Sequence, residues 1–288
     1  MKNIKVLNIR IDCLIKDELK EKLEQSFLDR KKVKIGKINT EFLLRAKSSK
    51  EFSDTINDFD LNIADGSGVL WAAKYLSLPL TQTPIIRQIQ AVWQAIYVGV
   101  SLIFYPKYCH SPIPERFPGM EAFYLMLNVA AKTQTPVYFF GAEDNVLSVA
   151  TEKIKKELPE LNIAGYHEGY HYDSKDIIEK INQSEAKLLI VAQGSPKQEY
   201  WIRDNINKLT SVKVAVGEGG TFDYIAGENK RAPKWMRKIG MEWLWRLFMN
   251  KNKTGQPDIR DNGRLKRVWN AVPVFIYNTI KFKLENND

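Results

Sequence analysis

Hydrophobic and polar residues follow two periods along the chain. Short runs of mostly apolar residues alternate with longer stretches in which apolar residues recur every three or four positions. The short runs predict buried strands, and the longer stretches predict amphipathic helices. Strands are predicted at 33–38, 61–64, 137–140, 161–164, 188–192 and 212–216, with one half-buried strand at 7–11 before them. Because strands and helices alternate, the pattern predicts an α/β fold with a Rossmann-like, predominantly parallel sheet flanked by helices.

The stretch 188–227 contains the most complete strand–loop–helix–strand unit. The apolar run at 188–192 leads into a polar loop, a helical pattern at 200–209, a second apolar run at 212–216 and a glycine-rich loop. Open α/β sheets bind their ligands at the carboxyl ends of the strands, where these loops lie. The loop at 217–220 is either an ordinary turn or a phosphate site, since glycines let an anion approach backbone N–H groups.

Two earlier strands also end in polar residues. Asn39-Thr40 follows the strand at 33–38, and Asp65-Gly66 follows the strand at 61–64. Thr40 is either the N-cap of the next helix or a substrate-binding group, and Asp-Gly is also a common turn pair. Two such polar ends in consecutive strand–helix units favour a shared cleft over coincidence.

An apolar insertion at about 83–113 interrupts the alternation. Its centre, Ile89–Tyr105, is mostly apolar, contains two glutamines and is slightly short for a transmembrane span. Three interpretations stay open: a core helix, an oligomer contact, or a segment that lies in a membrane interface. A membrane or partner contact is favoured over the core.

The positive charge lies at the end of the chain. Of the net charge of +9, residues 1–229 contribute nothing, with 29 basic and 29 acidic residues, whereas 230–288 contain 14 basic and 5 acidic residues together with many aromatic ones. We therefore predict an α/β catalytic domain at 1–229 and a helical, basic, aromatic-rich appendage at 230–288. Such a segment fits an anionic membrane surface, a nucleic acid or a diphosphate, or is a solvated helix pair. Arg260, Arg264 and Arg267 have the spacing of one helical face.

The remaining composition narrows the chemistry. Two cysteines exclude a disulfide framework and indicate a reducing compartment. Three histidines exclude a histidine-rich metal cage, and no metal site is expected. The start of the sequence predicts a strand rather than a signal peptide.

Six short motifs occur in a fixed order. They are Asn39-Thr40, Asp65-Gly66-Ser67-Gly68, Glu115-Arg116-Phe117-Pro118-Gly119, Gly194-Ser195-Pro196-Lys197-Gln198-Glu199, Gly217-Glu218-Gly219-Gly220-Thr221-Phe222-Asp223, and Arg231-Ala232-Pro233 followed by Met241-Glu242-Trp243-Leu244-Trp245-Arg246. This ordered set resembles the bacterial WecG/TagA/CpsF glycosyltransferases, glycosyltransferase family 26. The insertion at 83–113 departs from the family's pattern.

The resemblance implies a hexosyltransferase that needs neither a metal nor another cofactor. It would transfer a sugar with inversion from a UDP-sugar to a polyprenyl-diphosphate-linked acceptor in cell-surface polysaccharide or teichoic acid synthesis. The expected sugar is N-acetylmannosamine or its uronic acid, and another donor such as UDP-glucose is the alternative. The protein would act peripherally at the cytoplasmic face of the membrane, with homo-oligomer formation left open.

The resemblance also assigns site residues. It implies that Asp65 is the catalytic base and that Thr40 positions the substrate beside it, while the basic tail closes over the site. The expected substrate-binding residues are Asn39, Gly66, Ser67, Arg116, Gly119, Gly141, Gln193, Gly194, Lys197, Gln198, Glu199, Gly217, Gly219, Gly220, Asp223, Arg231, Arg260, Arg264 and Arg267.

Two other functional classes compete with this interpretation. A nucleotide-binding oxidoreductase is disfavoured because no G-x-G-x-x-G fingerprint opens the first helix. A non-catalytic module that binds nucleotides or nucleic acid through its basic tail is the more distant alternative, and no nucleic-acid partner is expected.

Overall fold

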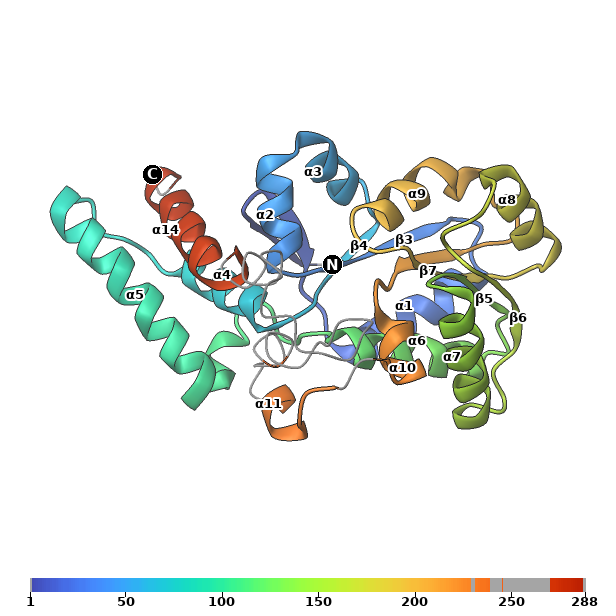
Figure 1. The fold of residues 1–288 in the computed structure, drawn as a ribbon. Coiled ribbons are helices and arrows are strands. Elements are labelled where there is room, and N and C mark those ends of the chain that lie inside the picture. The colour runs from blue at the N-terminus through green and yellow to red at the C-terminus, as the bar shows by residue number, and fades with distance from the viewer. Residues whose placement is uncertain (1, 229–230, 239–244, 246–269, 287–288) are drawn as a thin grey trace, which may run out of the picture.

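A six-stranded parallel sheet forms the centre of the molecule (Figure 1). The computed structural model describes residues 2–228, 231–238, 245 and 270–286. The sheet has the order β4-β3-β8-β7-β5-β6, and each neighbouring pair is parallel. Its strands are β3 (Val33–Ile38), β4 (Leu61–Ala64), β5 (Val137–Gly141), β6 (Ile163–His167), β7 (Leu188–Ala192) and β8 (Val214–Gly217). The predicted fold class is confirmed.

Helices cover both faces of the sheet because alternate strand residues point to opposite sides. The helices before the C-terminal part are α1 (Lys16–Leu28), α2 (Thr40–Ser48), α3 (Lys50–Asn57), α4 (Ser67–Ser77), α5 (Pro84–Phe104), α6 (Gly119–Lys132), α7 (Asp144–Glu157), α8 (Ser174–Gln183), α9 (Lys197–Asn205) and α10 (Thr221–Ala226). Val137 and Phe139 of β5 join a core cluster with α1, α6, α7 and α10. Tyr138 and Phe140 point to the other side, into a cluster with α8 and α9.

The first predicted strand, at 7–11, is correct only from Ile9 onward, since residues 3–12 form a hairpin. Strands β1 (Asn3–Val6) and β2 (Ile9–Asp12) pair antiparallel, and Leu7 and Asn8 turn the chain with φ of 48° and 67°. Positive φ at both central residues is typical of a type I′ turn in a two-residue hairpin. The apolar alternation runs through this turn and conceals it.

The predicted strand at 161–164 is shifted. Strand β6 begins at Ile163 and continues to His167, three residues beyond the predicted end at 164. It lies at the edge of the sheet, where its residues are mostly half-buried, so that its sequence lacks a clear apolar run.

A third core cluster lies beyond β4, at the edge of the sheet opposite β6 (Figure 1). Here α4 packs against α5 and against the last helix, α14 (Phe275–Glu285). The ring of Trp71 stacks on Tyr75, with centroids 5.3 Å apart, and lies 6.0 Å from the ring of Phe275. The last helix therefore completes the packing around α4.

The segment between β4 and α6 leaves the sheet and returns to the same place. The backbone N–H of Asp65 donates to the carbonyl oxygen of Ile38 at 2.7 Å, and the N–H of Phe117 donates to that of Ala64, also at 2.7 Å. Helix α5 and the short 3-10 helix η1 (Pro106–Cys109) lie between these two points. The excursion thus begins and ends beside Asp65.

Within the described residues, no helix meets the length and hydropathy needed to cross a membrane. Much of the predicted helical appendage at 230–288 falls outside those residues, and α11 (Lys234–Lys238) is described near its start. A π-helical turn, Asn270–Val274, leads into α14.

Candidate functional site

The candidate site lies at the carboxyl edge of the sheet. Strands β4, β3, β8 and β7 are neighbours there, so that the segments that follow them are brought together. Asp65 follows β4, Asn39 follows β3, Glu218 follows β8, and the loop to α9 follows β7. The sequence pattern predicts ligand binding at this edge, where open α/β sheets bind their ligands.

Asp65 is held by backbone groups. Its Oδ1 accepts a hydrogen bond from the N–H of Gly119 at 3.1 Å, and its side chain remains partly exposed. The next residue, Gly66, has φ of 107° and is the N-cap of α4, a conformation that strongly favours glycine. The carboxylate is thus fixed in direction and still reachable from solvent, as a general base must be.

A buried ion pair lies next to Asp65 and was missed in the sequence. Lys37 Nζ, on β3, donates to Glu218 Oε2 at 2.6 Å and to the carbonyl oxygen of Gly119 at 3.1 Å. The side chains of Lys37 and Glu218 are only 6% and 0% exposed. Burial raises the pKa of Glu218, the Lys37 charge opposes this, and the nearby Asp65 charge adds to it. The signal in the sequence that could have revealed this ion pair is Lys37 itself, a charged residue within a strand that is otherwise predicted to be buried.

The glycine loop after β8 is shaped by the start of α9. Gln198 Oε1 accepts from the N–H of Gly219 at 2.9 Å, while Gln198 Nε2 donates to Glu199 Oε1 at 2.6 Å. A Cβ atom on Gly217 would lie 2.5 Å from Gln198 Nε2, so the close approach requires glycine. Burial raises the pKa of Glu199 to about 7, against the hydrogen bond from Gln198.

Several N–H groups of this loop already have partners inside the protein. The N–H groups of Glu218 and Thr221 donate to the carbonyls of Val191 and Glu218, and that of Gly219 donates to Gln198. The anion cradle predicted for 217–220 is therefore not built from these three donors. Gly220 lies beside Asp223, whose pKa is raised by burial and by the nearby charges of Glu143 and Glu228.

The residues after β3 reach the loop after β4. The N-cap of α2 is Asn39, whose Oδ1 accepts from the N–H of Phe42 at 3.0 Å, so the N-cap role considered for Thr40 is wrong. Thr40 begins α2, and its methyl group lies against Gly68, where a Cβ atom would be 2.4 Å away. Ser67, the first residue of α4, is buried. The polar residues after β3 and after β4 are therefore in contact, at the carboxyl edge of the sheet.

A second group of predicted residues surrounds the ends of β5 and β7. Gly141, with φ of 128°, packs against the backbone of Ala192, and Gln193 Nε2 donates to the carbonyl of Gly169 at 3.5 Å. The carbonyl of Gly194 accepts from the N–H of Gln198 at 3.1 Å. Lys197 begins α9 and is exposed. Gln198 connects this group to the glycine loop after β8, because its N–H donates to Gly194 and its side chain accepts from Gly219.

The arginines predicted to bind substrate lie in three different parts of the chain. Arg116 Nη2 donates to the carbonyl of Arg237 at 2.7 Å, which ties the returning segment to α11. Arg231 lies near Tyr124 of α6 and acts on that hydroxyl electrostatically. Arg260, Arg264 and Arg267 lie outside the described residues.

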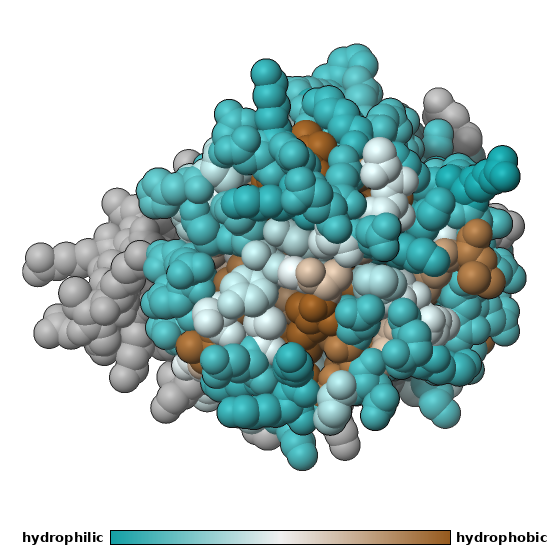
Figure 2. Space-filling model, turned by 90° about the vertical axis from the view of Figure 1, so that its right-hand side faces the viewer, coloured by the Kyte–Doolittle hydropathy of each residue, from teal (hydrophilic) through white to brown (hydrophobic). Residues whose placement is uncertain are grey.

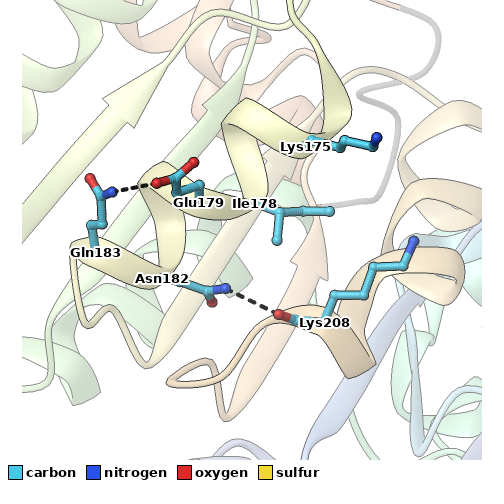
Figure 3. Close-up of a pocket in the computed structure, with 6 residues that line it drawn as sticks. All are labelled: Lys175, Ile178, Glu179, Asn182, Gln183 and Lys208. Atoms are coloured by element: carbon cyan, nitrogen blue, oxygen red, sulfur yellow. Dashed lines mark hydrogen bonds between the residues drawn. The ribbon is translucent and has the colours of Figure 1, made fainter.

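A surface hollow of about 540 Å³ lies elsewhere (Figure 3). Asn182 and Gln183 line it from the end of α8, and Lys208 lines it from η2 (Ile206–Lys208). Both segments precede strands, so the hollow lies toward the amino edge of the sheet. Its polar groups pair locally, with Gln183 donating to Glu179 and Asn182 to the Lys208 carbonyl. Among the described residues, no group of three or more His, Cys, Asp or Glu could hold a metal ion.

Comparison with known proteins adds the family. The model of the Glycosyl transferase WecG/TagA/CpsF family matches residues 4–96 and 85–287, and the two matches overlap within α5. N-acetylglucosaminyldiphosphoundecaprenol N-acetyl-beta-D-mannosaminyltransferases of Bacillus spizizenii strain W23 and Bacillus subtilis strain 168 are 34% and 33% identical over 152 residues, 53% of this chain. These matches span 59% of the length of each Bacillus relative.

A protein of the same name from Staphylococcus aureus strain MW2 is 26% identical over 245 residues, 85% of this chain and 78% of that protein. The family model covers the strand ends that carry Asp65 and Glu218 as well as the C-terminal part. The chain belongs to the WecG/TagA/CpsF family of glycosyl transferases.

Proposed function

We propose that the protein transfers a hexose with inversion from a UDP-sugar to a polyprenyl-diphosphate-linked acceptor. The observation that carries the proposal is the partly exposed carboxylate of Asp65, fixed by Gly119 at the carboxyl edge of the sheet. In a single displacement, an acceptor hydroxyl oxygen attacks the anomeric carbon, the bond to the diphosphate breaks, and Asp65 takes the hydroxyl proton. One displacement inverts the anomeric configuration.

The ion pair beneath Asp65 supports this role. Lys37 holds the carbonyl of Gly119, and the N–H of the same residue holds Asp65, so the base is connected to a buried, charge-paired support. Such a support restricts the direction of the carboxylate, and positioning of this kind lowers the barrier of a bimolecular reaction.

The leaving UDP carries negative charge that cationic groups must offset. We assign this role to basic residues around the loop ends and in the C-terminal segment, with Arg116 and Lys197 as the described candidates. The bond between Arg116 and the carbonyl of Arg237 supports a C-terminal segment that closes over the site. Closure of this kind would exclude water and suppress hydrolysis of the donor.

The names of the relatives guide the choice of substrate. They describe transfer of N-acetyl-beta-D-mannosamine to N-acetylglucosaminyldiphosphoundecaprenol. We propose the same sugar and the same class of acceptor for this chain, with UDP as the carrier, in the synthesis of a cell-surface polymer. The protein would work peripherally at the cytoplasmic face of the membrane, where such an acceptor is exposed.

The test is UDP release from a panel of UDP-sugars, with and without an N-acetylglucosaminyl-diphospholipid, in the presence of EDTA. We expect acceptor-dependent release from UDP-N-acetylmannosamine, and a loss of at least about a hundredfold in Asp65→Asn because the base is removed. Release from another donor such as UDP-glucose would change the proposed sugar. Near-normal turnover by Asp65→Asn would reject Asp65 as the base, and no release from any donor would reject the reaction.

A further inference from the structure

Helix α5 presents a continuous apolar face to solvent. Every exposed residue between Ile89 and Phe104 is aliphatic or aromatic, and these residues are Ile89, Val92, Trp93, Ile96, Tyr97, Val100, Ile103 and Phe104. At 3.6 residues per turn they occupy a sector of about 140°. Trp93 is 65% exposed and Phe104 is 81% exposed. An apolar patch of this extent marks an interaction surface.

The opposite face of α5 is tied to the protein. Ala91, Ala95 and Val98 are buried, and the ring N–H of Trp71 donates to the carbonyl of Ala95 at 3.1 Å. The side chain of Gln94 donates to the carbonyl of Pro79 at 2.8 Å and accepts from Lys283 at 2.7 Å. Gln94 therefore points toward the protein, and the apolar face has a fixed direction.

The charges around α5 favour a lipid surface as its occupant. No aspartate or glutamate occurs between Asp65 and Glu115, whereas Lys107 follows the end of α5. Arg87, in the first turn of α5, donates instead to the carbonyl of Leu284 in α14 at 2.7 Å. Nothing in this segment repels phosphate headgroups, and the exposed Lys107 lies near the C-terminal end of the apolar face.

The composition of the face also separates a bilayer from a second copy of the chain. Protein interfaces carry about one hydrogen bond per 100–200 Å², but the exposed residues of this face offer only the ring N–H of Trp93 and the hydroxyl of Tyr97. Tryptophan and tyrosine are also the residues that concentrate at the boundary between headgroups and acyl chains.

We propose that this face of α5 docks onto an anionic lipid bilayer, with its aliphatic side chains among the acyl chains and the exposed Lys107 at the headgroups. The helix lies at the end of the molecule beyond β4, the strand that leads into Asp65 (Figure 1). The opposite end, over β6 and α8, is mainly hydrophilic (Figure 2). Docking is inferred from this geometry. Its benefit to the protein rests on the proposed function, in which the acceptor is linked to a membrane lipid.

The test compares two double variants that add the same charge. Ile89→Glu/Ile96→Glu places two carboxylates on the exposed face, and Leu28→Glu/Val149→Glu places two at exposed apolar positions on α1 and α7. Flotation with phosphatidylglycerol vesicles is measured in about 0.5 M salt, which screens the contribution of exposed basic residues elsewhere. Light scattering reports the oligomeric state, and UDP release with a short-chain, water-soluble acceptor reports the reaction.

We expect the first variant to lose vesicle binding by about tenfold or more, and the control to bind as the parent protein does. Both variants should keep the parent's turnover of the water-soluble acceptor, so that a failed reaction in all three proteins would count against the proposed function and not against docking. Equal flotation of all three proteins would overturn the proposal. A parent dimer that dissociates only in Ile89→Glu/Ile96→Glu, without a change in flotation, would instead assign the face to a second copy.

Discussion

Lys37 and Glu218 place opposite charges where water is excluded. Each charge is costly to bury alone, and each is stabilised by the other at 2.6 Å. Thr221 Oγ1 adds a hydrogen bond to the same Glu218 oxygen at 3.0 Å. Since Lys37 also binds the carbonyl of Gly119, the pair supports the residue that orients Asp65.

Replacement of Lys37 by methionine should therefore destabilise the protein and its site together. We expect the free energy of unfolding at pH 8 to fall by about 3 kcal/mol or more, because Glu218 is left buried without a counter-charge. Burial already raises the pKa of Glu218, and the loss of Lys37 raises it further. A carboxyl with a raised folded-state pKa loses stabilisation as the pH rises through that value, so the deficit should shrink toward pH 5.

Urea unfolding at pH 5 and pH 8 measures this deficit. Lys37→Met/Glu218→Gln is the matched variant, since it removes both charges and should recover most of the lost stability. A deficit that is equal in the single and double variants, or independent of pH, would contradict the role given to the ion pair.

These residues also show how far the sequence leads at the site. Asp65 and Thr40 lie just after apolar runs, and the ends of such runs can be found without knowing the sheet order. The pairing of Lys37 with Glu218 joins residues 181 positions apart. No local pattern contains that contact, so the support of the site had to come from the structure.

At the scale of elements, buried segments are predicted best. Strands β3, β4 and β7 begin and end where their apolar runs do, because both faces of each strand are covered, even for β4 at the edge of the sheet. The first hairpin and β6 differ from the prediction because the apolar alternation of Leu7, Ile9 and Ile11 continues through the turn of the hairpin, and because β6 lies half-exposed at an edge. Helix α5 has one buried face and one exposed face, and both are apolar, so its sequence alone does not tell which side contacts the protein.

Asn39 illustrates an element boundary that can be mistaken for a binding site. Because its side chain accepts from the N–H of Phe42, Asn39→Ala should lower the free energy of unfolding by about 1 kcal/mol, while Asn39→Ser should keep most of the cap. Thermal unfolding of the two variants measures this difference. Turnover then decides the proposed substrate contact: full activity in Asn39→Ser would leave Asn39 as a cap only.

At the scale of the whole molecule, the C-terminal helix is part of the packing around α4. Phe275 is 2% exposed and contacts the ring of Trp71, and Lys283 is buried with its ammonium 4.2 Å above the ring of Tyr75. A chain that ended at residue 229 would lack these contacts. The division between 1–229 and 230–288 stays a prediction, and α14 lies in contact with the first of these parts.

Truncation of one side chain tests this packing. Phe275→Ala should lower the free energy of unfolding by about 3–5 kcal/mol, because a large aromatic ring leaves a cavity between α14 and α4. Tyr277→Ala, on the same helix but 65% exposed, is the matched control and should change it by less than about 0.5 kcal/mol. Urea unfolding distinguishes the two, and similar small losses would show that α14 contributes little to stability.

The contacts around Asp65 are also contacts between distant parts of the chain. The bond from Gly119 to Asp65 closes a loop of 54 residues, that from Lys37 to Gly119 one of 82, and that from Lys37 to Glu218 one of 181. Closing such loops costs chain entropy before it gains any contact, and non-local contacts slow folding. The helices can therefore form while the site is still open, and regained catalysis during refolding is a stricter sign of the native state than regained helicity.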